Sequence, residues 1–193
     1  MDYGFFALTN RMKYINRWQL MRCEHTENLA EHSFEVAVIA HALVSLANKR
    51  NNKSLNADRA AFLALYHDMP ETITGDMPTP VKHGNEELEK IYACVEENAC
   101  KKLLKMLPED LREDYSCAFE KTQENEQIQK YVKAADRISA YIKCIEEKKA
   151  GNAEFTTAAK QIYKSIKDLE LEEADIFLET FIPAYSLTLD EIC

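Results

Sequence analysis

Apolar residues recur at intervals of three and four along most of this chain, which is the spacing of amphipathic helices. The strongest pattern runs from Leu29 to Lys49, where Phe34, Val38, His41/Ala42 and Val44/Ser45 recur at helical spacing. The same spacing predicts further helices over residues 57–67, 86–107, 108–120, 123–149, 153–167 and 172–181. No stretch shows the strict alternation of a strand, so the pattern predicts an all-α fold.

Capping and helix-breaking residues set the ends of these elements. Asn56 is a good N-cap for the helix over 57–67, and Pro70 must end that helix. The adjacent pair His67 and Asp68 therefore lies at a helix C-terminus, where side chains can face a cleft. Residues 75–80 contain one Gly and two Pro, which predict a loop.

The composition indicates a single helical domain spanning residues 1–193. Hydrophobic residues make up 46% of the 193 residues, which is enough for a sizeable core. Only four Gly and five Pro are present, too few for a sheet protein with many tight turns. No internal repeat or Gly/Ser linker divides the chain.

The charge balance and the cysteines restrict partners and compartment. With 33 acidic and 24 basic residues the net charge is −9, which disfavours a nucleic-acid polymer but allows a small anion beside a metal. The chain has no uninterrupted apolar run of about 18 residues and no signal-peptide pattern, so we expect no membrane association. Six Cys without a C-x-x-C pair favour reduced thiols and a cytoplasmic protein.

Four residues carry side chains that bind metals: His32, His67, Asp68 and Asp136. Asp136 lies inside an apolar helical segment, where a carboxylate needs a partner. Taken alone, each residue is better explained as an ordinary surface or hydrogen-bonded polar group. Together, two imidazoles and two carboxylates suit one divalent transition metal: Mn, Fe, Co, Ni, Cu or Zn. Because no Cys takes part, the set favours an open catalytic site over a structural zinc site.

The order His32, His67-Asp68, Asp136 resembles the HD-domain metal-dependent phosphohydrolases, and longer motifs resemble the bacterial 5′-deoxynucleotidases. These motifs are Asn16-Arg17-Trp18 with Met21-Arg22, Thr26-Glu27-Asn28, Glu31-His32-Ser33, Tyr66 to Glu71, Thr74 to Lys82, Lys133 to Asp136, Ala140 to Cys144, and Phe181-Ile182-Pro183 with Leu187 to Ile192. The Arg-Trp pair and the Gly-Asp-x-Pro-Thr-Pro loop are the most specific of them. Met69-Pro70 stands where the family has small residues, and this departure affects no ligand position.

The resemblance implies an HD-type helical bundle that hydrolyses deoxyribonucleoside 5′-monophosphates to deoxynucleosides and phosphate, with a metal-bound water as the nucleophile. It implies that His32, His67, Asp68 and Asp136 hold the metal. Of these four, His32, Asp68 and Asp136 would also bind the substrate. It further implies a homodimer.

Other roles depend on the same resemblance. Arg17 is the candidate phosphate clamp, because a guanidinium binds two phosphate oxygens through its planar fork. Glu71 is the candidate general acid or base. Trp18 would wall the sugar pocket and crowd a 2′-hydroxyl. The remaining substrate-binding candidates form one loop: Asp76, Met77, Pro78 and Thr79. On residue type alone, Arg17 and Glu71 are explained as solvated side chains and Trp18 as core packing.

Two alternatives remain open at the level of sequence. An HD site could act on another nucleotide, such as a deoxynucleoside triphosphate, an alarmone or a cyclic nucleotide. The chain could also be a non-catalytic helical scaffold that retains a structural metal. Intact Arg17 and Glu71 favour an enzyme, because a structural metal site needs neither a phosphate clamp nor an acid.

Overall fold

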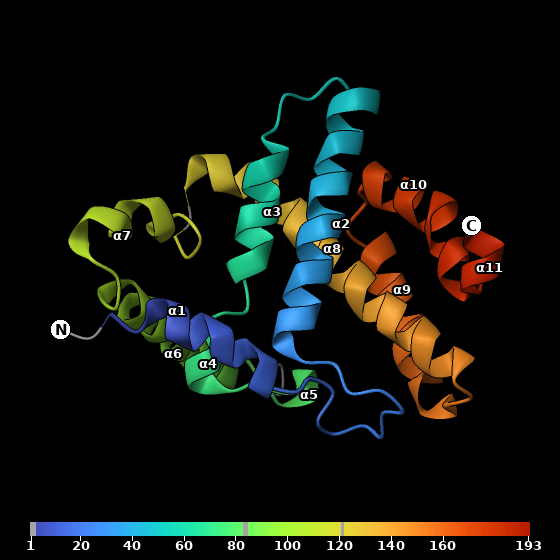
Figure 1. The fold of residues 1–193 in the computed structure, drawn as a ribbon, viewed down its shortest axis with the longest axis horizontal. Coiled ribbons are helices and arrows are strands. Elements are labelled where there is room, and N and C mark those ends of the chain that lie inside the picture. Colours follow the sequence, from blue (N-terminus) through green and yellow to red (C-terminus); the bar gives the residue numbers. More distant parts are fainter. Residues whose placement is uncertain (1–2, 83–84, 121) are drawn as a thin grey trace.

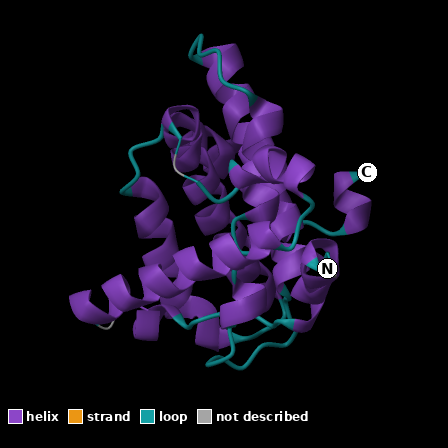
Figure 2. Ribbon diagram, turned by 90° about the vertical axis from the view of Figure 1, so that its left-hand side faces the viewer, coloured by secondary structure: helices purple, strands orange, loops and turns teal. Residues whose placement is uncertain are grey.

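The chain is all-α in the computed structural model, which describes residues 3–82, 85–120 and 122–193 (Figure 1). Helices are joined by loops, and no strand occurs in these residues (Figure 2). The extended chain makes one isolated antiparallel bridge, between Asn16 and Asn28. The predicted fold class is confirmed.

Most helices follow one another along the chain with short connections, but a long segment, residues 15–28, joins η1 to α2. In order they are α1 (Phe5–Thr9), η1 (Asn10–Tyr14), α2 (Leu29–Arg50), α3 (Ala57–Tyr66), α4 (Glu71–Thr74), α5 (Thr79–Lys82), α6 (Glu86–Lys105), α7 (Glu109–Ser116), α8 (Gln123–Lys149), η2 (Ala153–Phe155), α9 (Thr156–Lys167), α10 (Glu172–Thr180), η3 (Ile182–Ser186) and α11 (Leu189–Ile192).

Helices α2, α3 and α8 form the centre of the molecule, with α9 and α10 packed on one side (Figure 1). Their core contains Val36 and Leu63, which are fully or almost fully buried. A second apolar cluster contains Phe5, Leu29 and Met69 and joins the N-terminal helix to α6. The N-terminal turns of α2 and the chain after α3 therefore lie where the two clusters meet. Burial of Met69 gives a packing reason for the unusual residue after the His-Asp pair.

Most predicted helices are present, with shifts at their ends. The helix over 123–149 has the predicted bounds, and Asn56 caps α3 by accepting a hydrogen bond from the backbone N–H of Arg59. The predicted loop over 75–80 is too long, because Thr79–Lys82 forms the short helix α5. A proline is tolerated in a first helical turn, where its missing N–H would have no partner. The helix predicted over 108–120 is shorter in the structure, Glu109–Ser116.

The apolar positions that predicted α2 do not all pack. Val44 is fully buried, but Phe34 and Val38 are 67% and 55% exposed, whereas Val36 and Leu43 on the opposite side are fully buried. The difference has a physical cause: α2 is apolar on nearly every side, so helical spacing alone does not identify the face that packs. The buried side is the one that also carries His32.

By length and apolar composition, α2 could also cross a membrane. It contains no uninterrupted apolar run, because polar residues such as Glu35 and His41 occur within it. Half of its most apolar stretch is buried inside the protein, where α2 packs against α3 and α8. The hydropathy of α2 is that of the central helix of a bundle, and it is weak evidence for a membrane.

Candidate metal and phosphate site

Three helices bring the four candidate ligands together. His32 lies near the start of α2, which is fixed by a capping box between Asn28 and Glu31. His67 is the C-cap residue of α3, and Asp68 follows it in the turn before α4. Asp136 lies in the middle of α8, which packs against both α2 and α3.

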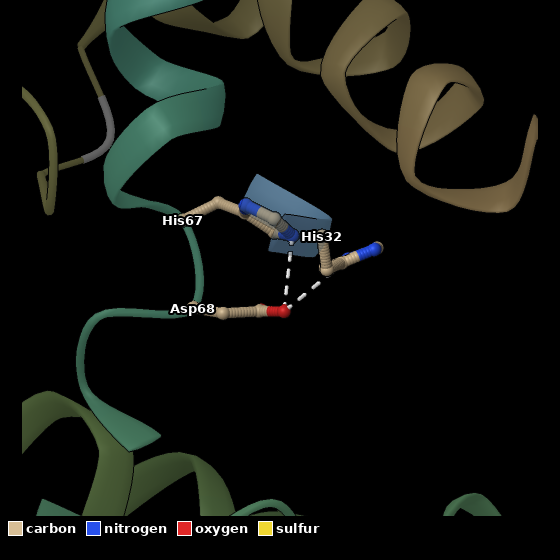
Figure 3. Close-up of side chains that lie close together, drawn as sticks. All are labelled: His32, His67 and Asp68. Carbon is tan, nitrogen blue, oxygen red and sulfur yellow. Dashed lines mark ion pairs between the residues drawn. The ribbon is translucent and has the colours of Figure 1, made fainter. Parts of the chain in front are cut away.

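The ligand atoms converge on one point. His32 Nε2 lies 3.1 Å from Asp136 Oδ1 and 3.5 Å from Asp68 Oδ2, and His67 Nε2 lies 3.2 Å from the same Asp68 oxygen. Figure 3 shows His67 and Asp68 meeting His32 from the chain that follows α3. Candidate ligand atoms of His32, His67 and Asp68 all lie within 4.8 Å of one another.

These residues fit a divalent transition metal. Two ligand atoms that are each about 2.0–2.2 Å from one metal lie about 3.0–3.5 Å apart, which matches the observed separations. His67 Nδ1 lies 2.6 Å from the carbonyl oxygen of Ala64, which can only accept, so Nδ1 carries a proton and Nε2 is the nitrogen that can bind a metal once it has lost its own proton. Neither Nε2 atom has a hydrogen-bond partner in the described part of the chain, although both are buried. A cation between these nitrogens and the facing carboxylates, either a proton or a metal ion, compensates the buried negative charge.

The charges of the cluster suit a metal as well. Burial and the nearby Arg17 lower the pKa of His32, so this imidazole is neutral at neutral pH. Burial raises the pKa of Asp68, but the neighbouring His67 and His32 outweigh it and hold that pKa well below its ordinary value. Burial lowers the pKa of His67, but the Asp68 and Asp136 carboxylates raise it overall to about 9. His67 therefore carries an extra proton at neutral pH, and a bound metal would replace that proton.

A second layer of hydrogen bonds fixes His32 from behind. His32 Nδ1 lies 3.0 Å from Ser139 Oγ, and the Ser139 hydroxyl donates to Glu35 Oε2 at 2.6 Å. Because the hydroxyl gives its only proton to Glu35, its oxygen accepts from His32 Nδ1–H. The sequence did not point to Ser139 or Glu35. Ser139 is 107 positions from His32 and 104 positions from Glu35, so no local pattern links these residues.

Arg17 and Trp18 lie on the extended segment that follows η1. They line an open cleft of about 610 Å³ together with Tyr14, Thr26 and Gly75. The Arg17 side chain is 15% exposed, and its Nη1 is buried without a hydrogen-bond partner in the described residues. A free, buried guanidinium edge beside the metal ligands is suited to bind an anion.

Glu71 opens α4, three residues after Asp68, and is 9% exposed. Its Oε2 is buried with no hydrogen-bond partner in the described chain. Burial, with the Asp68 and Asp76 carboxylates, raises the pKa of Glu71 to about 9, against the opposing charges of Arg17 and Lys82. Glu71 also lines a smaller cavity of about 200 Å³ with His67 and Asp68. A protonated carboxyl group there can donate a proton.

The loop after α4 begins at the cleft that contains Arg17 and Trp18. Gly75 has a φ of 76°, a left-handed conformation that suits glycine, and turns the chain out of α4. Burial raises the pKa of Asp76, while the charge of Arg17 opposes this shift. Met77 and Pro78 are half-buried, and the side chain of Thr79 lies outside what the structure describes.

Comparisons with known proteins agree on one family. The family model described as 5′-deoxynucleotidase YfbR-like matches residues 4–185. A 5′-deoxynucleotidase of Enterobacter sp. (strain 638) is 45% identical over 188 residues, 97% of this chain and 94% of that protein. One from Photorhabdus temperata is 46% identical, with 97% and 95% covered.

Solved structures share the fold at lower identity. An HD-domain phosphohydrolase from Listeria innocua superposes with a TM-score of 0.78 at 22% identity, over 95% of this chain and 88% of the other. An HD phosphohydrolase from cyanophage S-2L, bound to dA and one catalytic Zn²⁺ ion, gives a TM-score of 0.66 at 20% identity, with 92% and 95% covered.

Proposed function

This chain belongs to the YfbR-like 5′-deoxynucleotidase family, and we propose that it hydrolyses deoxyribonucleoside 5′-monophosphates to deoxynucleosides and inorganic phosphate. The observation that carries the proposal is the convergence of His32, His67 and Asp68 within this family's fold. Arg17 and Glu71 lie beside them and supply a phosphate-binding group and a proton donor, which phosphate-ester hydrolysis also requires.

His32, His67, Asp68 and Asp136 are the proposed metal ligands. The mixed nitrogen and oxygen donor set is compatible with Mn, Fe, Co, Ni, Cu or Zn, and the Zn²⁺ ion of the cyanophage protein supports zinc among these. When bound, a divalent metal would lower the pKa of a water molecule and neutralise charge on the phosphate oxygens. The Asp68 and Asp136 carboxylates, ionised at neutral pH, keep the site ready for a cation.

Arg17 binds the phosphate in this proposal. Its Nη1 is buried and unpaired among the described residues, while its Nε lies 3.7 Å from Glu27. A guanidinium held at one edge can offer the other edge to two phosphate oxygens. His32, Asp68 and Asp136 would then contact the phosphate from the metal side of the site.

Glu71 is the proposed general acid. A buried carboxyl whose pKa is raised to about 9 is protonated at neutral pH, so it can deliver a proton to the leaving 5′-oxygen. The bond from phosphorus to that oxygen breaks as water adds to phosphorus, and the deoxynucleoside leaves with the transferred proton.

Trp18 and the loop of Asp76, Met77, Pro78 and Thr79 are the proposed contacts to the sugar and phosphate. Trp18 lines the open cleft, where it would crowd a 2′-hydroxyl and favour deoxyribose. Replacing Trp18 with alanine is expected to bring the kcat/KM values for dAMP and AMP closer together. An unchanged ratio would reject this role.

The protein is further proposed to be a homodimer in the cytoplasm, with residues 1–193 as one domain. The exposed apolar side chains of α2 support an association surface. The six free Cys support a reducing compartment.

Phosphate release from metal-stripped protein tests the proposal. Deoxyadenosine and thymidine monophosphates, AMP and dATP are each supplied with Mn²⁺, Co²⁺, Zn²⁺ or Mg²⁺. We expect metal-dependent release from the deoxy monophosphates and little from AMP or dATP. Release mainly from dATP or AMP would keep the metal site but overturn the substrate. No release from a folded, metal-loaded protein would favour a non-catalytic scaffold.

A Glu71→Gln variant tests the acid in the same assay. Losing a general acid costs roughly 10²- to 10⁴-fold in kcat, and metal binding should survive because Gln keeps the shape of the side chain. Glu97→Gln is the matched control, since Glu97 lies on the surface of α6 and pairs with Lys101 on the same helix. Full activity of Glu71→Gln would remove Glu71 from the mechanism.

A further inference from the structure

Glu27 contacts both residues proposed to hold the phosphate and the sugar. Trp18 Nε1–H donates to Glu27 Oε2 at 2.8 Å, and Arg17 Nε lies 3.7 Å from the same oxygen. The backbone N–H of Arg17 donates to the Glu27 carbonyl oxygen at 2.9 Å. The Glu27 side chain is only 12% exposed. One residue therefore restrains the backbone and both side chains of the Arg17-Trp18 pair.

Trp18 needs such a restraint. Its φ is 60°, a left-handed conformation that is disfavoured for a bulky side chain. Residues in such conformations persist only where their surroundings hold them, and they concentrate at functional sites. The Trp18 ring is held by the hydrogen bond to Glu27 and by packing on Phe155, with ring centroids 5.2 Å apart.

Arg17 is restrained at one edge only. Glu27 faces its Nε, whereas Nη1 is buried with no hydrogen-bond partner in the described residues. The guanidinium charge also acts on Asp68 and Glu71. Without Glu27, this guanidinium would be drawn towards the carboxylates of the metal cluster instead of standing clear of them.

The segment that carries Glu27 is itself anchored. Glu147 of α8 accepts hydrogen bonds from the backbone N–H groups of Glu24 (2.9 Å) and His25 (3.2 Å). At the other end, Asn28 caps α2. Glu27 thus stands between two fixed points and has little freedom to follow Arg17 or Trp18 if they move.

We propose that Glu27 is a positioning residue that sets the orientation of Arg17 and Trp18 for phosphate and sugar binding. The inference rests on the proposed function for its kinetic consequence. The contact between Glu27 and Trp18 can be tested without any assay of activity. Trp18 is the only Trp in the chain, so the fluorescence of the protein reports this contact directly.

Two substitutions separate the two contacts. Glu27→Gln keeps an oxygen that accepts from Trp18 but removes the charge facing Arg17. Glu27→Ala removes both. Glu24→Gln is the control, because Glu24 lies three residues away on the same segment and its side chain is about half exposed. Trp18 emission, acrylamide quenching, circular dichroism, and kcat and KM for dAMP are measured on the metal-loaded protein.

We expect Glu27→Gln to keep the wild-type emission and to lose roughly 10- to 100-fold in kcat/KM, as loss of a contact to a charged group predicts. Glu27→Ala should lose more, shift the emission and increase quenching. Glu24→Gln should match the wild type in every readout. If Glu27→Ala does not fold, the kcat/KM of Glu27→Gln alone tests the positioning role.

A kcat/KM for Glu27→Gln and Glu27→Ala within twofold of the wild type would overturn the proposal, even if the emission changed. A wild type that hydrolyses no monophosphate would instead overturn the proposed function. Inorganic phosphate titrated by calorimetry then tests Glu27 alone: weaker binding by Glu27→Ala supports the positioning role, and equal binding rejects it.

Discussion

His32 is fully buried, and both of its ring nitrogens face a specific partner. Nδ1 faces Ser139, and Nε2 faces Asp136 and Asp68. Ligating histidines commonly donate their second ring N–H to a fixed acceptor, which sets the tautomer and the orientation of the ring. Ser139 does this for His32, and Glu35 in turn fixes the Ser139 hydroxyl.

Replacing Ser139 with alanine should therefore weaken metal binding. The buried Nδ1–H of His32 would lose its acceptor and the ring its alignment, and such second-layer losses reduce metal affinity by roughly 10- to 100-fold. Competition with a chromophoric chelator for Co²⁺ or Zn²⁺ measures this.

Ser116→Ala is the matched control for Ser139→Ala. Ser116 is likewise a helical serine whose hydroxyl donates a hydrogen bond, but its acceptor is the Glu113 carbonyl oxygen of its own helix, α7, which carries none of the candidate ligands. A Ser139→Ala protein with the wild-type metal affinity would show that the hydrogen bond does not orient His32.

At the residue scale, sequence identifies donors by type and order but not their supports. His32, His67, Asp68 and Asp136 could be proposed because a carboxylate or imidazole on an apolar segment needs a partner. Ser139 could not be proposed, since serine is common in helices and its partner is 107 positions away.

At the element scale, the C-terminal half of α8 holds the segment that leads into α2. Glu147, fully buried, accepts from Lys143 Nζ at 2.7 Å and Asn152 Nδ2 at 2.8 Å, in addition to two backbone N–H groups. Burial raises the pKa of Glu147, but these hydrogen bonds outweigh it and lower that pKa to about 2. The Lys143 side chain is 3% exposed, so the Lys143–Glu147 ion pair is buried.

This network predicts acid sensitivity. Because the pKa of Glu147 is lower in the folded state than in the unfolded chain, its stabilisation is complete above about pH 5 and is lost as the pH falls towards 2. The shift corresponds to roughly 3 kcal/mol of unfolding free energy at neutral pH. In urea unfolding, the difference between the wild type and Glu147→Gln should be largest at pH 7, should be clearly smaller at pH 3 and should disappear only below about pH 2.

Glu97→Gln serves as the control for Glu147→Gln. Both glutamates pair with a lysine four residues away, but the Glu97–Lys101 pair is exposed, and exposed pairs contribute little. A constant difference between wild type and Glu147→Gln from pH 7 to pH 3 would show that the Glu147 charge is not the source of the stabilisation.

Element positions were predictable where caps and amphipathicity agree. The bounds of α8 and the cap at Asn56 follow from local chemistry. The buried face of α2 did not follow, because Phe34 and Val38 are as apolar as the residues that pack. Only contacts with α3 and α8 distinguish the two faces, and these depend on the whole fold.

At the scale of the whole molecule, the exposed side of α2 is unusual for a central helix. Phe34 is 67% exposed and Val38, one turn later, 55% exposed. Contiguous exposed apolar side chains often mark association surfaces. A stable homodimer buries about 1,200–2,000 Å² in total, which is more than two side chains supply, so neighbouring elements would have to contribute.

Phe34→Glu tests whether this side of α2 forms the proposed dimer interface. If it does, the wild type sediments with twice the mass of one chain, and Phe34→Glu sediments as a monomer because two buried carboxylates would face each other across the two-fold axis. Ile91→Glu on α6, where the apolar side chain is also 55% exposed, is the control and should remain dimeric. The reverse result would move the interface to α6, and a monomeric wild type at high concentration would reject the dimer. Because Phe34 lies two residues from His32, retained phosphate release by Phe34→Glu would separate loss of the dimer from damage to the site.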